Sequence, residues 1–271
     1  MYKRGLWCFT QLIEIMNNKI VAIIPARLNS IRYPEKVLIK IKGLSMIEHV
    51  RRRVLLSNAF EDVYVATCDY KIKREIEQFH GKVIMTSRNN KTATERVAEA
   101  AQQIKCSHVV NVQGDEILIV PNDLKILATK IKFNKNVSYW NAISDIKKSE
   151  LLNIDVVKCI TDFSNKIIHC SRVISLPKPN GKNIRVNKIL GVFAYSKKGL
   201  LNFKKLKRTN IESFESIDQS RVVENKLLLK GVHLKNAFPG INTKQEEKQV
   251  IGILKNNKLQ KNILKRILNY C

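Results

Sequence analysis

The chain has 271 residues, of which 44% are hydrophobic, and a formal net charge of +26 at pH 7. This length and composition allow a sizeable buried core, and no apolar run approaches the ~18 residues that a membrane-spanning helix needs. The positive charge would suit a polyanion. The lysines, however, are spread along the whole chain instead of forming a stripe, so we expect no specific nucleic acid partner.

The cysteines and the N-terminus both bear on location. The six cysteines form no CxxC pair and show no metal-like spacing with the five histidines, which is typical of free thiols in a reducing cytosol. We expect residues 1–15 not to be a signal peptide, because Glu14 interrupts their apolar stretch and no small-residue cleavage site follows. We interpret them as an N-terminal extension and expect a cytoplasmic protein.

The first chemical signal is a loop after an apolar run. Residues 20–24 predict a buried strand, and open α/β sheets bind ligands beyond the C-terminal ends of their strands. The following loop carries three cations and a hydroxyl, namely Arg27, Ser30, Arg32 and Lys36. Arginine fits phosphate oxygens with a planar donor fork and lysine adds a mobile charge, so the loop suits a polyphosphate. A solvated basic loop is the alternative.

Strand and helix patterns alternate after this loop. Capping boxes, Ser45 with Glu48 and Thr92 with Glu95, predict helices over residues 45–58 and 92–103. Further patterns predict a helix at residues 71–79 and strands at 62–67, 82–86 and 108–113. The alternation indicates an α/β, Rossmann-like fold with a mostly parallel central sheet covered on both faces.

The pattern changes in the second half of the chain. Shorter β-like segments over residues 137–195 predict a smaller inserted β-rich part that covers the site or pairs two subunits. Helical periodicity returns at residues 213–227 and from residue 243 onward. A helical tail, residues 258–271, follows a main domain over residues 16–257. Its apolar side either lies on a membrane surface or, as we expect, packs on the core.

A second chemical signal is the segment VQGDE at residues 112–116. It directly follows an apolar strand, so it belongs to the same sheet edge as the first loop. Gly114 lets the backbone turn closely, and Asp115 adds a carboxylate opposite the cationic loop. This combination suits a Mg²⁺–nucleotide, because magnesium is held by one or two carboxylates together with phosphate oxygens. A simple turn is the alternative for this segment alone.

These segments carry a family resemblance that covers roughly residues 19–255. IPARLNSIRYPEK, MTSRNNKTATERVAEAA, VNVQGDE, the pair Ser171 and Arg172, and ESIDQSRVVEN occur in the order found in CMP-KDO synthetases. The chain thus resembles a divergent 3-deoxy-manno-octulosonate (KDO) cytidylyltransferase. The resemblance implies a nucleotidyltransferase fold, Mg²⁺, a homodimer, and transfer of CMP from CTP to the anomeric hydroxyl of an acidic 3-deoxy-2-keto sugar. Pyrophosphate would be released, and the product would serve lipopolysaccharide or surface polysaccharide synthesis.

The resemblance also implies roles for individual residues. The nucleotide would be bound by Arg27, Ser30, Arg32, Lys36, Arg88, Thr94 and Arg96. The sugar would be bound by Gln113, Arg172, Asp218 and Gln219, with Arg172 as the partner of its carboxylate. Lys36, Arg32 and Asp115 would be catalytic, and Asp115 and Asn242 would hold the metal. For Thr94 a capped surface helix is the alternative, and no side chain stands out as the general base.

Three positions at which the family binds metal or sugar depart from its pattern. Asn242 replaces an aspartate that binds metal, and Ile189 and Phe193 replace a histidine and a tyrosine that touch the sugar. An amide carries no charge, so we expect weaker Mg²⁺ binding, and lost hydrogen bonds to a sugar hydroxyl alter substrate choice. Two alternatives therefore stay open. One is a nucleotidyltransferase of the same fold for a different acidic sugar, and the other is a degraded, non-catalytic nucleotide-binding homologue.

Overall fold

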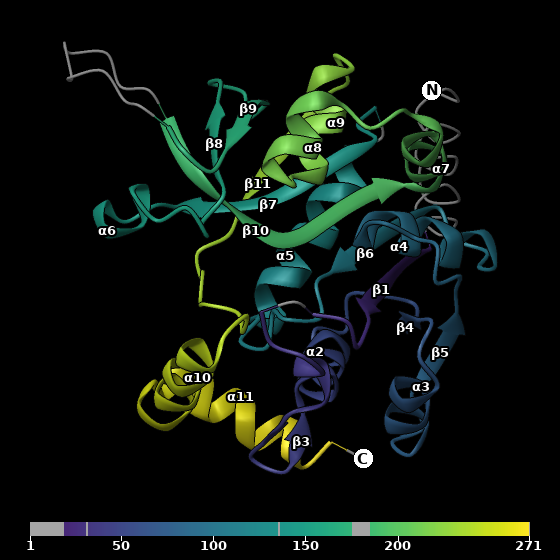
Figure 1. Ribbon diagram of the computed structural model, residues 1–271, viewed down its shortest axis with the longest axis vertical. Coiled ribbons are helices and arrows are strands. Elements are labelled where there is room, and N and C mark those ends of the chain that lie inside the picture. Colours follow the sequence, from purple (N-terminus) through teal and green to yellow (C-terminus); the bar gives the residue numbers. More distant parts are fainter. Residues whose placement is uncertain (1–18, 31, 135, 175–184, 271) are drawn as a thin grey trace, which may run out of the picture.

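The computed structural model describes residues 19–30, 32–134, 136–174 and 185–270. Its centre is a sheet in the order β11-β7-β10-β6-β1-β4-β5 (Figure 1). The strands are β1 (Ile20–Ala26), β4 (Val63–Thr67), β5 (Lys82–Met85), β6 (His108–Val112), β7 (Tyr139–Asp145), β10 (Arg185–Ser196) and β11 (Leu229–His233). Strand β10 runs antiparallel to β6 and β7, whereas β1, β4, β5 and β6 pair in parallel, as do β7 and β11. The predicted mostly parallel α/β sheet is confirmed.

Helices cover both faces of this sheet. The helices of the described residues are α2 (Met46–Leu55), α3 (Tyr70–Glu77), α4 (Ala93–Gln102), α5 (Pro121–Phe133), α6 (Lys148–Leu151), α7 (Lys197–Lys205), α8 (Asn210–Glu215), α9 (Asp218–Glu224), α10 (Lys244–Asn256) and α11 (Lys258–Leu268). A short 3₁₀ helix, η1 (Lys36–Leu38), and the ribbon of β2 (Lys40–Ile41) and β3 (Leu44–Ser45) lie between β1 and α2.

Strand β1 explains why its sequence is an unbroken apolar run. Its side chains alternate between faces, so Ala22 and Ile24 join the core under α2 and α5, whereas Val21 and Ile23 join the core under α4 and α7. A strand buried on both faces cannot alternate between polar and apolar residues. Burial of β1 on both faces fixes the position of the loop that leaves its C-terminal end.

The two predicted capping boxes behave differently. Thr92 caps α4, because its hydroxyl accepts the Glu95 N–H, although the Glu95 carboxylate accepts the N–H of Lys91. The box at α2 is wrong. Ser45 makes no side-chain cap bond, and the Glu48 carboxylate instead pairs with two arginines on the next turn, Arg51 and Arg52, with N–O distances of 2.7 Å. Charge-assisted bonds to guanidinium groups outweigh a neutral backbone N–H.

The β-rich part predicted as an insert at residues 137–195 is continuous with the central sheet. Strands β7 and β10 are members of that sheet, and the hairpin of β8 (Lys158–Thr161) and β9 (Ile167–Ser171) pairs with the first half of β10. A register shift between Ile189 and Phe193 lets this long strand serve both parts. The single helix predicted at residues 213–227 is also divided, because Ser216 adopts a left-handed φ of 56° between α8 and α9.

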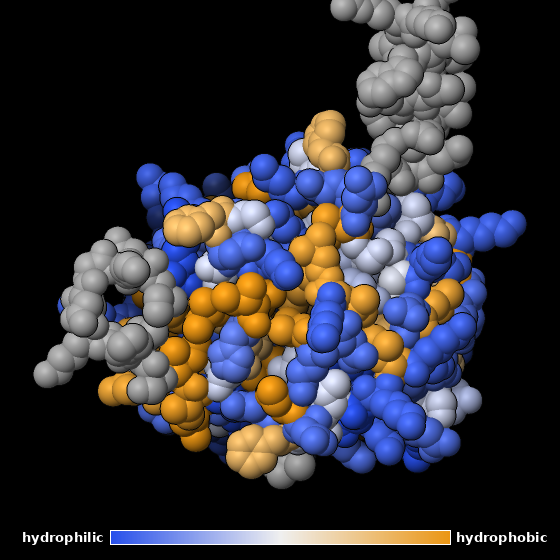
Figure 2. All heavy atoms as spheres, turned by 90° about the horizontal axis from the view of Figure 1, so that it is seen from above, coloured by the Kyte–Doolittle hydropathy of each residue, from blue (hydrophilic) through white to orange (hydrophobic). Residues whose placement is uncertain are grey.

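The hairpin and α8 form an outer surface at the top of Figure 1. Large apolar side chains are exposed on the hairpin, on the segments before β8 and after β9, and on α8. They are Leu152, Ile154, Phe163, Ile168, Val173 and Phe214. We call this set the apolar face. The view from above shows apolar side chains gathered among hydrophilic ones (Figure 2).

The C-terminal helix α11 packs on the core, as expected. Ile263 and Ile267 are buried against Leu44 and Val120, and the carbonyl of Ile267 accepts a hydrogen bond of 2.7 Å from Arg52 of α2. No helix within the described ranges is long and apolar enough to cross a membrane. The extension predicted at residues 1–15 lies outside the described residues.

Candidate functional site

A cavity of about 600 Å³ opens where β1 and β6 end. This volume is typical of a small-molecule site. Its lining includes Arg27, Ser30, Arg32 and Lys36 from the loop after β1, Gln113, Gly114 and Asp115 from the loop after β6, and Thr92, Arg96 and Asn242. Most residues predicted for the nucleotide and the metal therefore surround one space. We call it the nucleotide cavity.

Gly114 brings the two loops together. A Cβ atom at this position would lie 2.9 Å from the Pro25 carbonyl oxygen and 3.3 Å from Ile47 Cδ1. Any side chain would push the β6 loop away from β1. Glycine at residue 114 is therefore what lets Asp115 approach the cationic loop.

Lys36 is the centre of a polar cluster at the floor of the nucleotide cavity. Its ammonium group donates to Asp115 Oδ2 at 2.8 Å, to Asn242 Oδ1 at 2.8 Å and to the Ile241 carbonyl oxygen at 3.0 Å. The Lys36 side chain is only 13% exposed, so these bonds form away from bulk water. Gly240 supports the cluster, because a Cβ there would lie 2.8 Å from the Asp115 carbonyl oxygen. Three oxygen atoms thus converge on one cation.

The donors of this cluster fit magnesium. A carboxylate and an amide oxygen are hard ligands of the kind that Mg²⁺ accepts, with phosphate oxygens and water completing its shell. Within the part of the chain that the structure describes, no group of three or more His, Cys, Asp or Glu side chains could hold a metal. Asp115 and Asn242 alone form an incomplete set, which would need oxygens from a substrate.

The cations of the nucleotide cavity differ in how firmly they are held. Arg27 is exposed and makes no side-chain hydrogen bond or ion pair with the described residues. Arg32 pairs with Asp155 at 2.7 Å, but both side chains are more than half exposed. Arg96 is buried and donates to the Thr86 hydroxyl and the Ser87 carbonyl, so it braces the wall. The exposed cations are those that can follow an anionic ligand.

A second cavity of about 350 Å³ adjoins the first, and the two share Arg27, Thr92, Ala93, Gln113 and Ser216. We call it the sugar cavity, and both cavities are named after the ligands that the family resemblance implies. Its other lining residues are Lys91, Thr94, Phe193, Arg208, Asp218 and Gln219. Burial raises the pKa of Asp218, and Gln219 donates to Asn141 Oδ1 at 2.6 Å. Gln113, Asp218 and Gln219, which are predicted to bind the sugar, meet here. Thr94, which is predicted to bind the nucleotide, also lines this cavity and not the first one.

Two predicted residues line neither cavity. Arg88 is exposed at the end of the loop after β5. Arg172 donates from Nε to the Glu215 carbonyl oxygen at 2.8 Å and from Nη1 to the Ile154 carbonyl oxygen at 3.0 Å, so its guanidinium ties the hairpin to α8. Their roles at a ligand stay predictions.

Sequence reasoning missed two groups near the site. Arg208 lines the sugar cavity, and its sequence signal was its position directly before the capping box of α8, which opens at Thr209. Glu116 was read only as part of VQGDE. Its carboxylate accepts the Gly191 N–H at 2.9 Å, and burial, with Asp115 next to it, raises the pKa of Glu116 to about 7.

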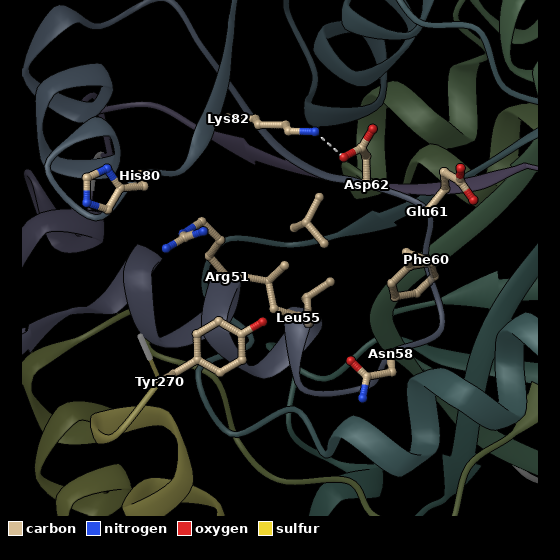
Figure 3. A pocket seen from close by; sticks show the side chains of 11 residues that line it. Arg51, Leu55, Asn58, Phe60, Glu61, Asp62, His80, Lys82 and Tyr270 are labelled. Carbon is tan, nitrogen blue, oxygen red and sulfur yellow. Dashed lines mark hydrogen bonds and ion pairs between the residues drawn. The ribbon is translucent and has the colours of Figure 1, made fainter.

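A third hollow, of about 200 Å³, lies at the opposite edge of the sheet, where β4 begins (Figure 3). Lys82 and Asp62, which both line it, form an ion pair. Arg51 is bound to Glu48, and Glu61 pairs with Lys19. Because these charges are matched within the fold, the adjoining cavities at the C-terminal edge are the candidate site.

Comparison with known proteins gives a consistent result. Residues 21–234 match a family model described as cytidylyltransferase. The 3-deoxy-manno-octulosonate cytidylyltransferase of Fusobacterium nucleatum subsp. nucleatum is 34% identical over 245 residues, which cover 89% of this chain and 99% of the relative. The protein of the same name from Escherichia coli is 30% identical over 227 residues, which cover 83% of this chain and 92% of the relative.

A solved structure is similar along nearly the same length. It is that of CMP:2-keto-3-deoxy-manno-octonic acid synthetase complexed with CTP. The TM-score is 0.83 at 28% sequence identity, and the match covers 88% of this chain and 99% of the other. The arrangement of the sheet and its helices is therefore shared with that protein.

Proposed function

The chain belongs to the 3-deoxy-manno-octulosonate cytidylyltransferase family, and we propose that it transfers CMP from CTP to KDO or a closely related 3-deoxy-2-ulosonic acid. The reaction releases pyrophosphate and supplies an activated sugar for lipopolysaccharide or another surface polysaccharide. The observation that carries this proposal is the convergence of Lys36, Asp115 and Asn242 in a cavity that adjoins a second one through Arg27.

The two cavities suit an in-line displacement. The anomeric hydroxyl of the sugar attacks the α-phosphorus, the new oxygen–phosphorus bond forms as the bond to the β-phosphate breaks, and the hydroxyl loses its proton. Arg27 lines both cavities, so it lies where the α-phosphate and the attacking hydroxyl meet. Arg32 and Lys36 are positioned to neutralise the leaving pyrophosphate. Catalysis then rests on positioning and on charge neutralisation.

We further propose that Asp115 and Asn242 hold Mg²⁺ together with the triphosphate. When bound, the ion would neutralise phosphate charge. Lys36 now donates to both of these side chains. Its flexible stem allows the ammonium to turn from them towards phosphate oxygens when the nucleotide enters.

The wall of the sugar cavity bears on which sugar is used. Phe193 is buried and lines this cavity at the position where the family resemblance implies a tyrosine. A phenyl ring cannot hydrogen-bond a sugar hydroxyl, so discrimination at that hydroxyl is weaker. This substitution supports a second candidate substrate, a different acidic sugar handled by the same reaction.

Pyrophosphate release tests the proposal. The purified chain is supplied with CTP, Mg²⁺ and, separately, KDO, 8-amino-KDO or N-acetylneuraminic acid. We expect release with KDO or 8-amino-KDO and none with CTP alone. Release only with N-acetylneuraminic acid would assign the chain to a different sugar. Silence with all three sugars, while CTP still binds, would contradict the proposal.

We also propose that the protein acts in the cytosol as a homodimer. The four free cysteines among the described residues support that compartment, since its reductants keep thiols unpaired. The apolar face supports the dimer, because exposed large apolar side chains are typical of an interaction site. Light scattering after size exclusion should give about twice the chain mass of 31.2 kDa. Phe214→Glu, at the 91% exposed Phe214, should shift the mass to that of one chain. A wild-type monomer would contradict the proposal.

A further inference from the structure

Arg208 lies at the mouth of the sugar cavity, and its positive charge is only weakly paired. It precedes α8 and lines that cavity, and its side chain is 38% exposed. Its Nε lies 3.4 Å from Glu212 Oε1, which is long for a charge-assisted hydrogen bond. Among the described residues this is its one ion pair.

Glu212 is already neutralised by another arginine. Arg221 donates from Nε to Glu212 Oε2 at 2.7 Å and from Nη2 to Glu212 Oε1 at 2.5 Å. Both side chains are almost fully buried, with exposures of 1% and 0%. A bidentate, buried pair of this kind satisfies the carboxylate. The charge of Arg208 is therefore left over for an anion outside the fold.

The rest of the sugar cavity adds to this positive surplus. The side chains of Lys91 and Arg27 have no hydrogen-bond or ion-pair partner in the described part of the chain. The carboxyl group in the lining, Asp218, is more easily protonated than usual because burial raises its pKa. Gln113 and Gln219 supply neutral polar groups. The cavity thus combines cations at its mouth with amides and hydroxyls inside, which suits a polyhydroxylated acid.

Arg172 is less suited to this anion. Its Nε and Nη1 are directed to the carbonyl oxygens of Glu215 and Ile154, and it lines neither cavity. To bind a ligand in the sugar cavity, Arg172 would have to break the bonds that join the hairpin to α8. Arg208 needs to give up only one long contact.

We propose that Arg208 binds the carboxylate of the sugar acid and so selects acidic sugars over neutral ones. This inference rests on the proposed function and identifies the side chain that recognises the carboxylate of the sugar. The guanidinium fork can grip both carboxylate oxygens, and the hydroxyls of the sugar then lie against Gln113 and Gln219. The motifs that carry the family resemblance do not include Arg208, so the resemblance gives this residue no role.

Steady-state kinetics with saturating CTP and Mg²⁺ test the proposal in Arg208→Gln, Arg208→Lys and a matched control, Lys207→Gln. Lys207 is the exposed neighbour of Arg208 and lines neither cavity. We expect Arg208→Gln to raise the KM for the sugar acid about 10- to 100-fold, the effect of losing a charged hydrogen bond. The KM for CTP should change far less. Arg208→Lys should recover part of the loss, and Lys207→Gln should match the wild type.

A substrate comparison separates this role from a structural one. The wild-type chain should prefer the sugar acid to its C1 carboxamide, and Arg208→Gln should lose most of that preference while melting at the wild-type temperature. If Arg172→Gln instead abolishes the preference and Arg208→Gln keeps it, the assignment is overturned. An equal rise in the KM for CTP in Arg208→Gln would overturn it as well. A wild-type chain that is inactive with every sugar would instead refute the proposed function.

Discussion

The nucleotide cavity and the sugar cavity differ in how their charges are matched. In the nucleotide cavity, Lys36 donates hydrogen bonds to Asp115 and Asn242. In the sugar cavity, Arg208 keeps one long contact and Lys91 has no side-chain partner among the described residues. The first arrangement holds the oxygens of Asp115 and Asn242 pre-organised around one cation, Lys36, whose place the proposed Mg²⁺ takes, and this suits catalysis. The second arrangement leaves positive charge that an anionic ligand would neutralise, which suits selection among substrates.

The largest effect is expected from Asp115→Asn, which removes the carboxylate from the pre-organised cluster of the nucleotide cavity. We expect a loss of about 10³-fold or more in kcat/KM, because this carboxylate anchors both Lys36 and the proposed ion. The fold should persist, since the Asp115 side chain is 29% exposed and asparagine has nearly the same shape. Pyrophosphate release and thermal melting check the two halves of the prediction. A near-normal rate would refute the metal assignment.

Arg32→Gln separates ligand binding from stability. The pair of Arg32 and Asp155 is more than half exposed on both sides, so its loss should cost less than about 1 kcal/mol of unfolding free energy. The kcat/KM for CTP should fall about tenfold or more, because a charged contact to phosphate is lost. Urea unfolding and steady-state kinetics measure these effects. A large stability loss with unchanged kinetics would make Arg32 a structural residue.

Asn242→Asp adds a charge to the pre-organised cluster. A second carboxylate attracts both the Lys36 ammonium and Mg²⁺, but the divalent ion gains more from it. We therefore expect the Mg²⁺ concentration for half-maximal rate to fall by roughly tenfold, an effect of about 1.4 kcal/mol. A Mg²⁺ titration after chelation of residual metal measures this, with Asn90→Asp, at another asparagine that lines the same cavity, as the matched control. An equal response in both variants would argue against a role for Asn242 at the metal.

Much of the nucleotide cavity could be predicted from sequence because parallel strands bring their C-terminal ends to one edge. The apolar runs before Pro25 and Gln113 identify strands, and topology then places Lys36 near Asp115. The position of Asn242 in this cavity could be predicted only from the family resemblance, because its segment follows a long irregular stretch after β11. The β-rich part predicted at residues 137–195 is present, but its continuity with the central sheet could not be predicted. A register shift in β10 joins the hairpin to that sheet.

Arg208 could not be predicted because its role depends on how other charges are shared. The sequence shows one carboxylate, Glu212, that could pair with either of two arginines, Arg208 or Arg221. The structure decides that Glu212 binds Arg221 with two short bonds and leaves Arg208 free to act elsewhere. The capping box predicted at Ser45 is absent for the same reason. The Glu48 carboxylate binds the guanidinium groups of Arg51 and Arg52 instead of a backbone N–H. Competition among charged side chains is settled by packing, which no sequence spacing encodes.

The smallest effect is expected from Asp218→Asn in the sugar cavity. Burial raises the pKa of Asp218 above its ordinary value, so the folded state holds a proton that the unfolded chain releases as the pH increases. The stability that this group contributes is present below its unfolded pKa and is lost as the pH rises through the folded pKa. The asparagine variant cannot ionise, so it should melt at a slightly higher temperature than the wild type at neutral pH and with a flatter pH profile. A parallel profile in both proteins would mean that Asp218 titrates normally, and the surplus positive charge of the sugar cavity would then be smaller than its lining suggests.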